Sequence, residues 1–147
     1  MDRLAHLLSQ GRSGVYLLAG RHGPAAVERL CRLKRVRLFR IDGRNVLTKR
    51  RFLAVAARAL DFPSWFGFNW DAFEDCVTDL EWILSPACVV LLENMEQFAQ
   101  RAPRDFDIAL QILEAAAEFW SGKAVSFHVL VSSIQTESAP LPETSPL

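Results

Sequence analysis

Short runs of β-branched and aromatic residues recur along this chain, and longer segments with helical spacing of apolar residues lie between them. The strand-like runs are Val15 to Leu18, Val36 to Ile41, Cys88 to Leu92 and Val125 to Val131. The helical segments are Pro24 to Leu33, Thr48 to Leu60, Trp70 to Ile83 and Phe106 to Trp120. Strands that alternate with helices need crossover connections, so the pattern predicts an α/β fold with a small, mainly parallel sheet packed with helices.

Length and composition favour one main domain. The chain has 147 residues, half of them hydrophobic, which is enough apolar surface for one core. The segment from Gln135 onward, "QTESAPLPETSPL", is rich in Pro, Ser, Thr and Glu and predicts a disordered tail. The first twenty residues contain apolar runs too short for a signal peptide or a membrane helix. We therefore expect a soluble, cytosolic protein.

Charge is distributed unevenly, although the formal net charge is zero. Residues 1–58 contain 14 Lys or Arg against 3 Asp or Glu, whereas residues 59–100 contain eight acids and no Lys or Arg. This separation predicts a strongly dipolar surface. One region is suited to an anionic partner and the other to a cationic one.

Residue types that hold metals or form disulfides are scattered along the chain: Cys31, Cys76, Cys88, His6, His22 and His128. Their spacing indicates neither a zinc site nor a disulfide framework, and we expect His128 to be a core or edge residue of a strand. No serine-nucleophile elbow or P-loop is present, and acids on a helix surface lack the enclosure that shifts a catalytic pKa. We expect no enzymatic activity, no metal and no other cofactor.

The stretch "FPSWFGFNWDAFEDC", residues 62–76, combines six aromatic residues with a concentration of acids. Asn69 is expected to cap the following helix, and Gly67 to supply a permissive turn before it. At helical spacing, the acids share one side: Asp71, Glu74, Asp75 and Asp79. The apolar set lies opposite and should face the sheet: Phe73, Val77, Leu80 and Leu84, with Trp70 and Cys76 at its edges.

An acidic stripe of this kind can be a solvated helix face, but three acids here repeat at i, i+4 and i+8 without a neighbouring base. The unneutralised stripe suggests that a partner supplies the cations. We also expect one or two of the aromatic rings to be exposed beside it. Carboxylates can stand for phosphates and a ring for a base, so this surface could imitate a nucleic acid.

Residues 62–82, "FPSWFGFNWDAFEDCVTDLEW", resemble the signature of barstar-like proteins. The resemblance extends more loosely from "FRIDG" through "VVLLENMEQF" and "ALQILEAAAE" to "SFHVLVSS", over roughly residues 36–132. It implies a domain over 36–133 and an N-terminal extension over 1–35 packed on it, and the disordered tail predicted from composition then covers 134–147. The function that it implies is intracellular inhibition of a barnase-type ribonuclease.

The resemblance also implies which residues bind the nuclease. Asp71 and Asp75 match the two helix aspartates that meet the nuclease's cationic side chains, and Trp65 matches the loop aromatic that stacks in the active site. The remaining matches concern the turn, the helix start and the end of the motif: Gly67, Asn69, Ala72 and Thr78.

This sequence departs from the family pattern at three positions. Glu74 replaces a tryptophan and Asp79 replaces a glycine, so the surface is more acidic and suggests a different nuclease. The family's accessory acid falls on Ala115, and Glu114 next to it is the candidate replacement.

We therefore expect a partner protein, namely a basic ribonuclease or nuclease toxin, with no membrane or direct nucleic-acid binding and a monomeric free state. An alternative is an RNA-tethered or regulatory adaptor that uses the basic N-terminal region. Its six bases between residues 29 and 40 could bind RNA. They could instead protect an exposed edge strand from association, and this is the interpretation that we favour.

Overall fold

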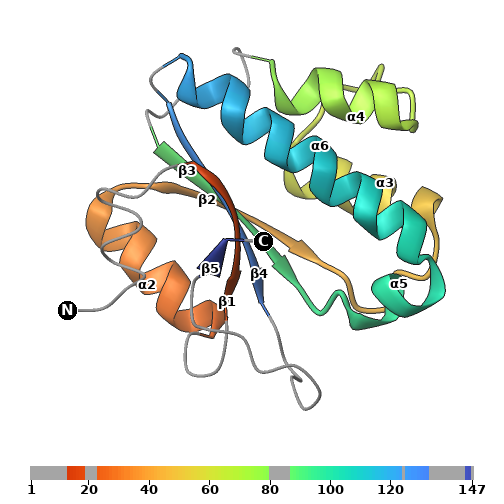
Figure 1. The fold of residues 1–147 in the computed structure, drawn as a ribbon, viewed down its shortest axis with the longest axis horizontal. Coiled ribbons are helices and arrows are strands. Elements are labelled where there is room, and N and C mark those ends of the chain that lie inside the picture. Colours follow the sequence, from red (N-terminus) through yellow and green to blue (C-terminus); the bar gives the residue numbers. More distant parts are fainter. Residues whose placement is uncertain (1–12, 19–22, 80–86, 124, 133–144, 147) are drawn as a thin grey trace.

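The fold is a five-stranded sheet with helices on both faces (Figure 1). The computed structural model describes residues 13–18, 23–79, 87–123, 125–132 and 145–146. The strands lie in the order β2-β3-β4-β1-β5, and they are β1 (Gly14–Leu18), β2 (Arg37–Asp42), β3 (Ala87–Glu93), β4 (Ser126–Ser132) and β5 (Ser145–Pro146). The first four strands pair in parallel and β5 pairs antiparallel with β1. The predicted α/β class and mainly parallel sheet are confirmed.

The described helices are α2 (Pro24–Lys34), α3 (Lys49–Ala59), α4 (Trp70–Val77), α5 (Glu96–Arg101) and α6 (Pro103–Ser121). Among them, α2 packs on one face of the sheet, and α3, α4 and α6 pack on the other (Figure 1). None of the described helices combines the length and the hydropathy of a membrane-spanning segment.

Local sequence signals fix where several elements begin. The Thr48 hydroxyl oxygen accepts a hydrogen bond from the Arg51 N–H at 3.2 Å, which caps α3. Pro24 and Pro103 open α2 and α6, where a missing N–H costs nothing. In β3, every residue after Ala87 is buried, which is typical of a central strand covered on both faces.

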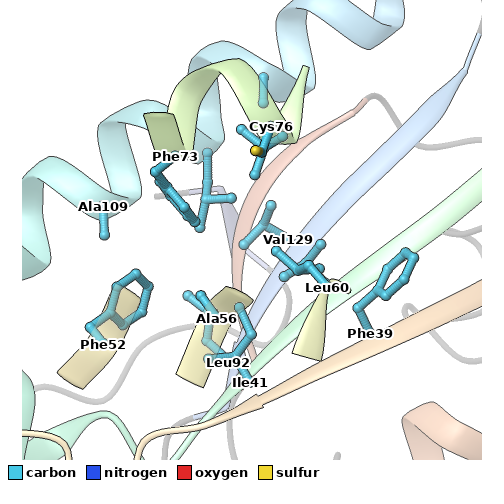
Figure 2. Packing of buried hydrophobic residues seen from close by; sticks show 14 of the residues in the cluster. Phe39, Ile41, Phe52, Ala56, Leu60, Phe73, Cys76, Leu92, Ala109 and Val129 are labelled. Atoms are coloured by element: carbon cyan, nitrogen blue, oxygen red, sulfur yellow. The ribbon is translucent and has the colours of Figure 1, made fainter. Parts of the chain in front are cut away.

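The larger core lies between the sheet and the face covered by α3, α4 and α6. Figure 2 shows Phe52 of α3 and Phe73 of α4 in this core, to which Val129 of β4 also belongs. The Phe52 ring also stacks on Phe98, with the two centroids 5.1 Å apart. These buried contacts hold α4 on the sheet through its apolar side and leave its other side for solvent.

The smaller core lies beneath α2. Val27 and Cys31 of α2 pack with Val89, Leu91 and Leu130 of the sheet. His128 is buried in the interior strand β4, with its ring centroid 6.2 Å from that of Tyr16, so it is a core residue rather than an edge one.

A close approach at the end of β2 requires a glycine. The Gly43 N–H donates to the Glu93 carbonyl at 2.7 Å, which continues the pairing of β2 with β3. A Cβ at Gly43 would lie only 2.6 Å from the Asn94 carbonyl oxygen and 2.9 Å from the Met95 sulfur. The backbone could not keep this distance with a larger residue.

Charged side chains also connect β2 with β3 at this end of the two strands. Arg40 donates two hydrogen bonds to the Glu93 carboxylate, at 2.7 and 3.0 Å. Hydrogen bonds from Arg44 lower the pKa of Asp42 to about 2, and a bond from Asn94 contributes to the shift.

The structure corrects the helix predicted from Trp70 to Ile83, because α4 ends at Val77. The Thr78 hydroxyl donates to the Glu74 carbonyl at 2.8 Å, and the Thr78 backbone (φ −111°, ψ 13°) has left the helical region. A hydroxyl that bonds back to the preceding turn competes with helix continuation. Residues 80–83, and with them Leu80 and the later Leu84, lie outside the described residues.

Two further differences concern the segment before β4. The six-residue helix α5 was not predicted, because it is too short to produce a helical period. Helix α6 begins three residues before Phe106, at Pro103. Of the predicted tail, only residues 145 and 146 are described, and the division at residue 35 stays a prediction.

Candidate partner-binding site

The turn before α4 is set by Asn69. Its side-chain oxygen accepts from the Ala72 N–H at 2.7 Å, so the predicted cap is confirmed. Its amide nitrogen donates to the Gly67 carbonyl at 3.4 Å, and a Cβ at Gly67 would lie 3.3 Å from this nitrogen. Gly67 therefore leaves room for the capping side chain.

The left-handed residue of this turn is Phe68, with φ 55°, rather than Gly67. This corrects the role expected for the glycine. The Phe68 ring lies 4.9 Å from the Phe66 ring, and the Arg50 guanidinium lies 5.8 Å from its centroid. These ring contacts help to hold a backbone conformation that bulky residues rarely adopt.

The aromatic rings divide between core and surface. Phe62, Phe66 and Phe73 are buried, whereas the Trp65 and Phe68 residues are 68% and 42% exposed. The expectation that one or two rings are exposed is confirmed. The loop formed by residues 62–68, called the aromatic loop below, is anchored by the buried rings of Phe62 and Phe66 and presents the Trp65 indole to solvent.

Three carboxylates, on Asp71, Glu74 and Asp75, lie exposed on α4 and are called the acidic ridge below. Phe73, Cys76 and Val77 on the opposite side are buried, as the helical spacing predicted. Within the described part of the chain, no ion pair or side-chain hydrogen bond reaches the three carboxylates. Only Asp71 lies in the first turn, where the helix dipole favours an acid.

Asp79 and Thr78 differ from their predicted placement on the helix. Asp79 follows the end of α4 and is half-buried, so the i, i+4, i+8 stripe reduces to Asp71 and Asp75. The Thr78 hydroxyl is engaged with carbonyls of its own helix, at Glu74 and Asp75. Both residues lie at the C-terminal end of the ridge.

Two cations near the ridge were not identified from the sequence. The Lys49 ammonium lies 5.8 Å from the centroid of the half-buried Trp70 ring, and Arg50 lies over Phe68. Both cations contact aromatic faces rather than the carboxylates. No spacing rule could place them there, because α3 and the aromatic loop meet only in the folded chain.

Glu114 lies exposed on α6, as predicted, on a stripe where Gln111 donates to Asp107 at 3.3 Å. It lines a cavity of about 530 Å³ together with Ser13, Gly14, Gln111, Ala115, Glu118 and Ser121. The Trp120 indole N–H donates to the Val77 carbonyl at 2.8 Å and joins α6 to the end of α4. Among the described residues, no group of three or more potential ligands is arranged to hold a metal ion.

Structural comparison supports the fold. The chain is similar to the ORC2 protein of Aeropyrum pernix in its ADPNP-ADP complexes, with a TM-score of 0.59 and 18% identity. The match covers 88% of this chain and 37% of the ORC2 chain, so this chain spans little more than a third of the length of the ORC2 protein. At this identity the likeness concerns the fold alone. Comparison with curated proteins finds no match.

The family comparison agrees with the motif. A family model described as barstar (barnase inhibitor) matches residues 36–132, which is more than half of the chain and includes the aromatic loop, the acidic ridge, and the strands β2, β3 and β4. Strand β1 and helix α2 precede the matched region. The chain therefore belongs to the barstar family.

Proposed function

We propose that this chain inhibits a basic, barnase-type ribonuclease by placing α4 and the preceding aromatic loop in the active site of the nuclease. The observation that carries the proposal is the acidic ridge on the same helix–loop unit as the exposed indole of Trp65. A ribonuclease holds phosphates with cationic side chains and bases by stacking. Carboxylates and an indole are groups that can occupy both kinds of position.

The charge of the ridge supports a cationic partner. Asp71 and Asp75 lie one helical turn apart, and like charges at this spacing destabilise a helix by about 0.2–0.5 kcal/mol. A basic cleft would relieve this repulsion, while the buried ring of Phe73 keeps the helix in place. The family membership supports inhibition of a ribonuclease rather than binding of another basic protein.

The test is the inhibition of RNA cleavage by purified barnase-type ribonucleases, beginning with barnase. Asp75→Ala should weaken binding by about 2–5 kcal/mol, or roughly 30- to 5,000-fold, because it leaves a buried cation of the nuclease unpaired. This range rests partly on the barnase–barstar complex, so it is a value for the family. Asp71→Ala should act in the same direction.

Glu96→Ala is the matched control, because Glu96 is exposed on α5, away from α4 (Figure 1). It should bind like the parent chain. If Asp71→Ala and Asp75→Ala also bound like the parent, the ridge would not be the interface. The variants must keep the parent's thermal stability for this comparison to count.

Salt dependence tests the electrostatic part of the proposal. Association with the nuclease should slow steeply as salt rises, because charges more than about 8 Å apart are screened at physiological ionic strength. The double variant Glu74→Gln, Asp79→Asn should lower both the association rate at low salt and its dependence on salt. Stopped-flow rates that stay flat for both proteins would leave shape complementarity alone to explain binding.

A further inference from the structure

A second charged surface lies at the other end of the molecule, on α2 and the start of β2. Its exposed bases are Arg29, Arg32, Lys34, Arg35, Arg37 and Arg40, called the α2–β2 basic surface below. It lies away from α4, and α2 packs on the opposite face of the sheet (Figure 1). Most of it also precedes the region matched by the family model, which begins at residue 36.

Acids neutralise only part of this surface. Glu28 lies 3.8 Å from Arg32 and 3.6 Å from Arg40, and Glu93 binds Arg40 at 2.7 Å. By contrast, no acid pairs with the remaining arginines of the surface anywhere in the described ranges, namely Arg29, Arg35 and Arg37. The surface therefore keeps a net positive charge.

Structural roles account for some of these bases but not for all. Strand β2 is an edge of the sheet, so Arg37 and Arg40 can discourage edge-to-edge association. Arg32 and Lys34 lie in the last turn of α2, where cations are favourable. Arg29 lies before that turn and belongs to neither group, and Arg35 follows it in a left-handed conformation with φ 59°.

We propose that the α2–β2 basic surface binds the phosphate backbone of a nucleic acid. Five of its six bases are arginines, whose planar guanidinium matches phosphate geometry with two parallel hydrogen bonds. An anionic membrane is the weaker fit, because a membrane-binding face needs a band of apolar side chains. Among the described residues of this surface, Leu33 is the one exposed large apolar side chain, at 75%, and a single leucine does not form such a band.

The surface offers no exposed aromatic ring among its described residues, so bases would not be read by stacking. Binding should therefore be independent of sequence and strongly salt-dependent. This proposal departs from our sequence-based expectation of no nucleic-acid partner, which attributed the bases to edge protection. The departure rests on the bases of α2, which lie outside the edge strand.

The test is fluorescence anisotropy of the full-length chain with a labelled single-stranded RNA of about 20 nucleotides, alongside a DNA of the same sequence. With roughly three to five phosphates neutralised, the logarithmic salt slope should be about −2 to −3.5. Raising salt from 50 to 200 mM should then weaken binding roughly 15- to 130-fold. The DNA arm tells whether the sugar contributes, since equal affinities indicate the phosphate backbone alone.

The triple variant Arg29→Gln, Arg35→Gln, Arg37→Gln should lose at least about tenfold in RNA affinity, and its salt slope should fall by about 2. Each change removes a cation that has no acid partner in the described chain. Circular dichroism should show an unchanged fold, because these side chains are exposed.

The matched control is Arg51→Gln, Arg58→Gln, Arg104→Gln, which removes the same charge from exposed positions on α3 and α6. It should change RNA affinity by less than about threefold. Equal losses in the two triple variants would overturn the proposal, because total charge rather than this surface would then govern binding. Binding to phosphatidylserine vesicles in the absence of RNA binding would also overturn it. Inhibition of the ribonuclease should be unaffected by the first triple variant, so the two proposals can fail separately.

Discussion

Replacing Phe73 or Trp65 with alanine should have opposite effects on folding and on binding, although the two aromatic residues are only eight positions apart. The Phe73 side chain is fully buried, and its ring centroid lies 5.8, 6.0 and 5.8 Å from those of Phe52, Phe62 and Trp70. Phe→Ala in a core costs about 3–5 kcal/mol. Because the Phe73 ring makes three edge-on ring contacts, we expect the loss of stability to lie in the upper part of this range.

For a chain of this size, each kcal/mol shifts the melting temperature by about 2–4 °C, so Phe73→Ala should melt roughly 8–20 °C below the parent. Trp65→Ala should stay within about 0.5 kcal/mol of the parent, because two thirds of the residue is exposed. Thermal denaturation followed by far-ultraviolet circular dichroism measures the melting temperatures of both variants, without using the tryptophan signal that one variant removes.

Phe73→Leu is the matched control, because it keeps an apolar side chain at the site and should lose less stability than Phe73→Ala. A larger loss in Trp65→Ala than in Phe73→Ala would refute the assignment of core and surface rings in the loop. Under the proposed function, Trp65→Ala should also weaken ribonuclease inhibition while leaving the melting curve in place.

Three further predictions concern residues away from the ridge. Gly43→Ala should lower the free energy of unfolding by about 1–3 kcal/mol through backbone overlap, whereas Gly23→Ala, which has open space, should change it by less than about 1 kcal/mol in the same urea titration. The pKa of Asp42 is lowered to about 2 from its ordinary 3.8, so its stabilising contribution is present above pH 4 and lost as the pH falls towards 2. In Asp42→Asn, the midpoint of urea unfolding should therefore depend less on pH over that interval. Burial raises the pKa of the Cys31 and Cys88 thiols to about 11 and 12, so a disulfide reagent at pH 8 should label them slowly until urea is added, and rapid native labelling would contradict their burial.

Features set by local chemistry were accessible from the sequence. The run from Cys88 to Leu92 predicted strand β3, and the helix starts predicted at Thr48 and Trp70 match those of α3 and α4 within one residue. The acidic and apolar sides of α4 followed from its 3.6-residue period. Each of these signals operates within a few positions, so no tertiary contact was needed to identify it.

Features set by tertiary contacts were not accessible. Strand order depends on long-range pairing, and the approach of Lys49 and Arg50 to the aromatic loop depends on how α3 packs. The left-handed backbone at Phe68 was assigned to the neighbouring glycine, because the contacts that favour it, with the Phe66 ring and with Arg50 of α3, form only in the folded chain. The end of α4 was missed for a local reason, since Thr78 can either continue a helix or bond back to it.

The position of β1 in the sheet has a consequence for the order in which the protein can fold. The Ser13 hydroxyl accepts from the Phe127 N–H, a contact that joins residues 114 positions apart, and β1 pairs along its whole length with β4. The ribosome synthesises β1 long before β4, so β1 cannot pair with β4 until most of the core residues have been made. Closing such a long loop makes folding slow and leaves the apolar strand β3 without its β4 neighbour during synthesis. Released chains truncated before residue 126 should therefore be captured by chaperones, whereas released chains that include β4 should escape them.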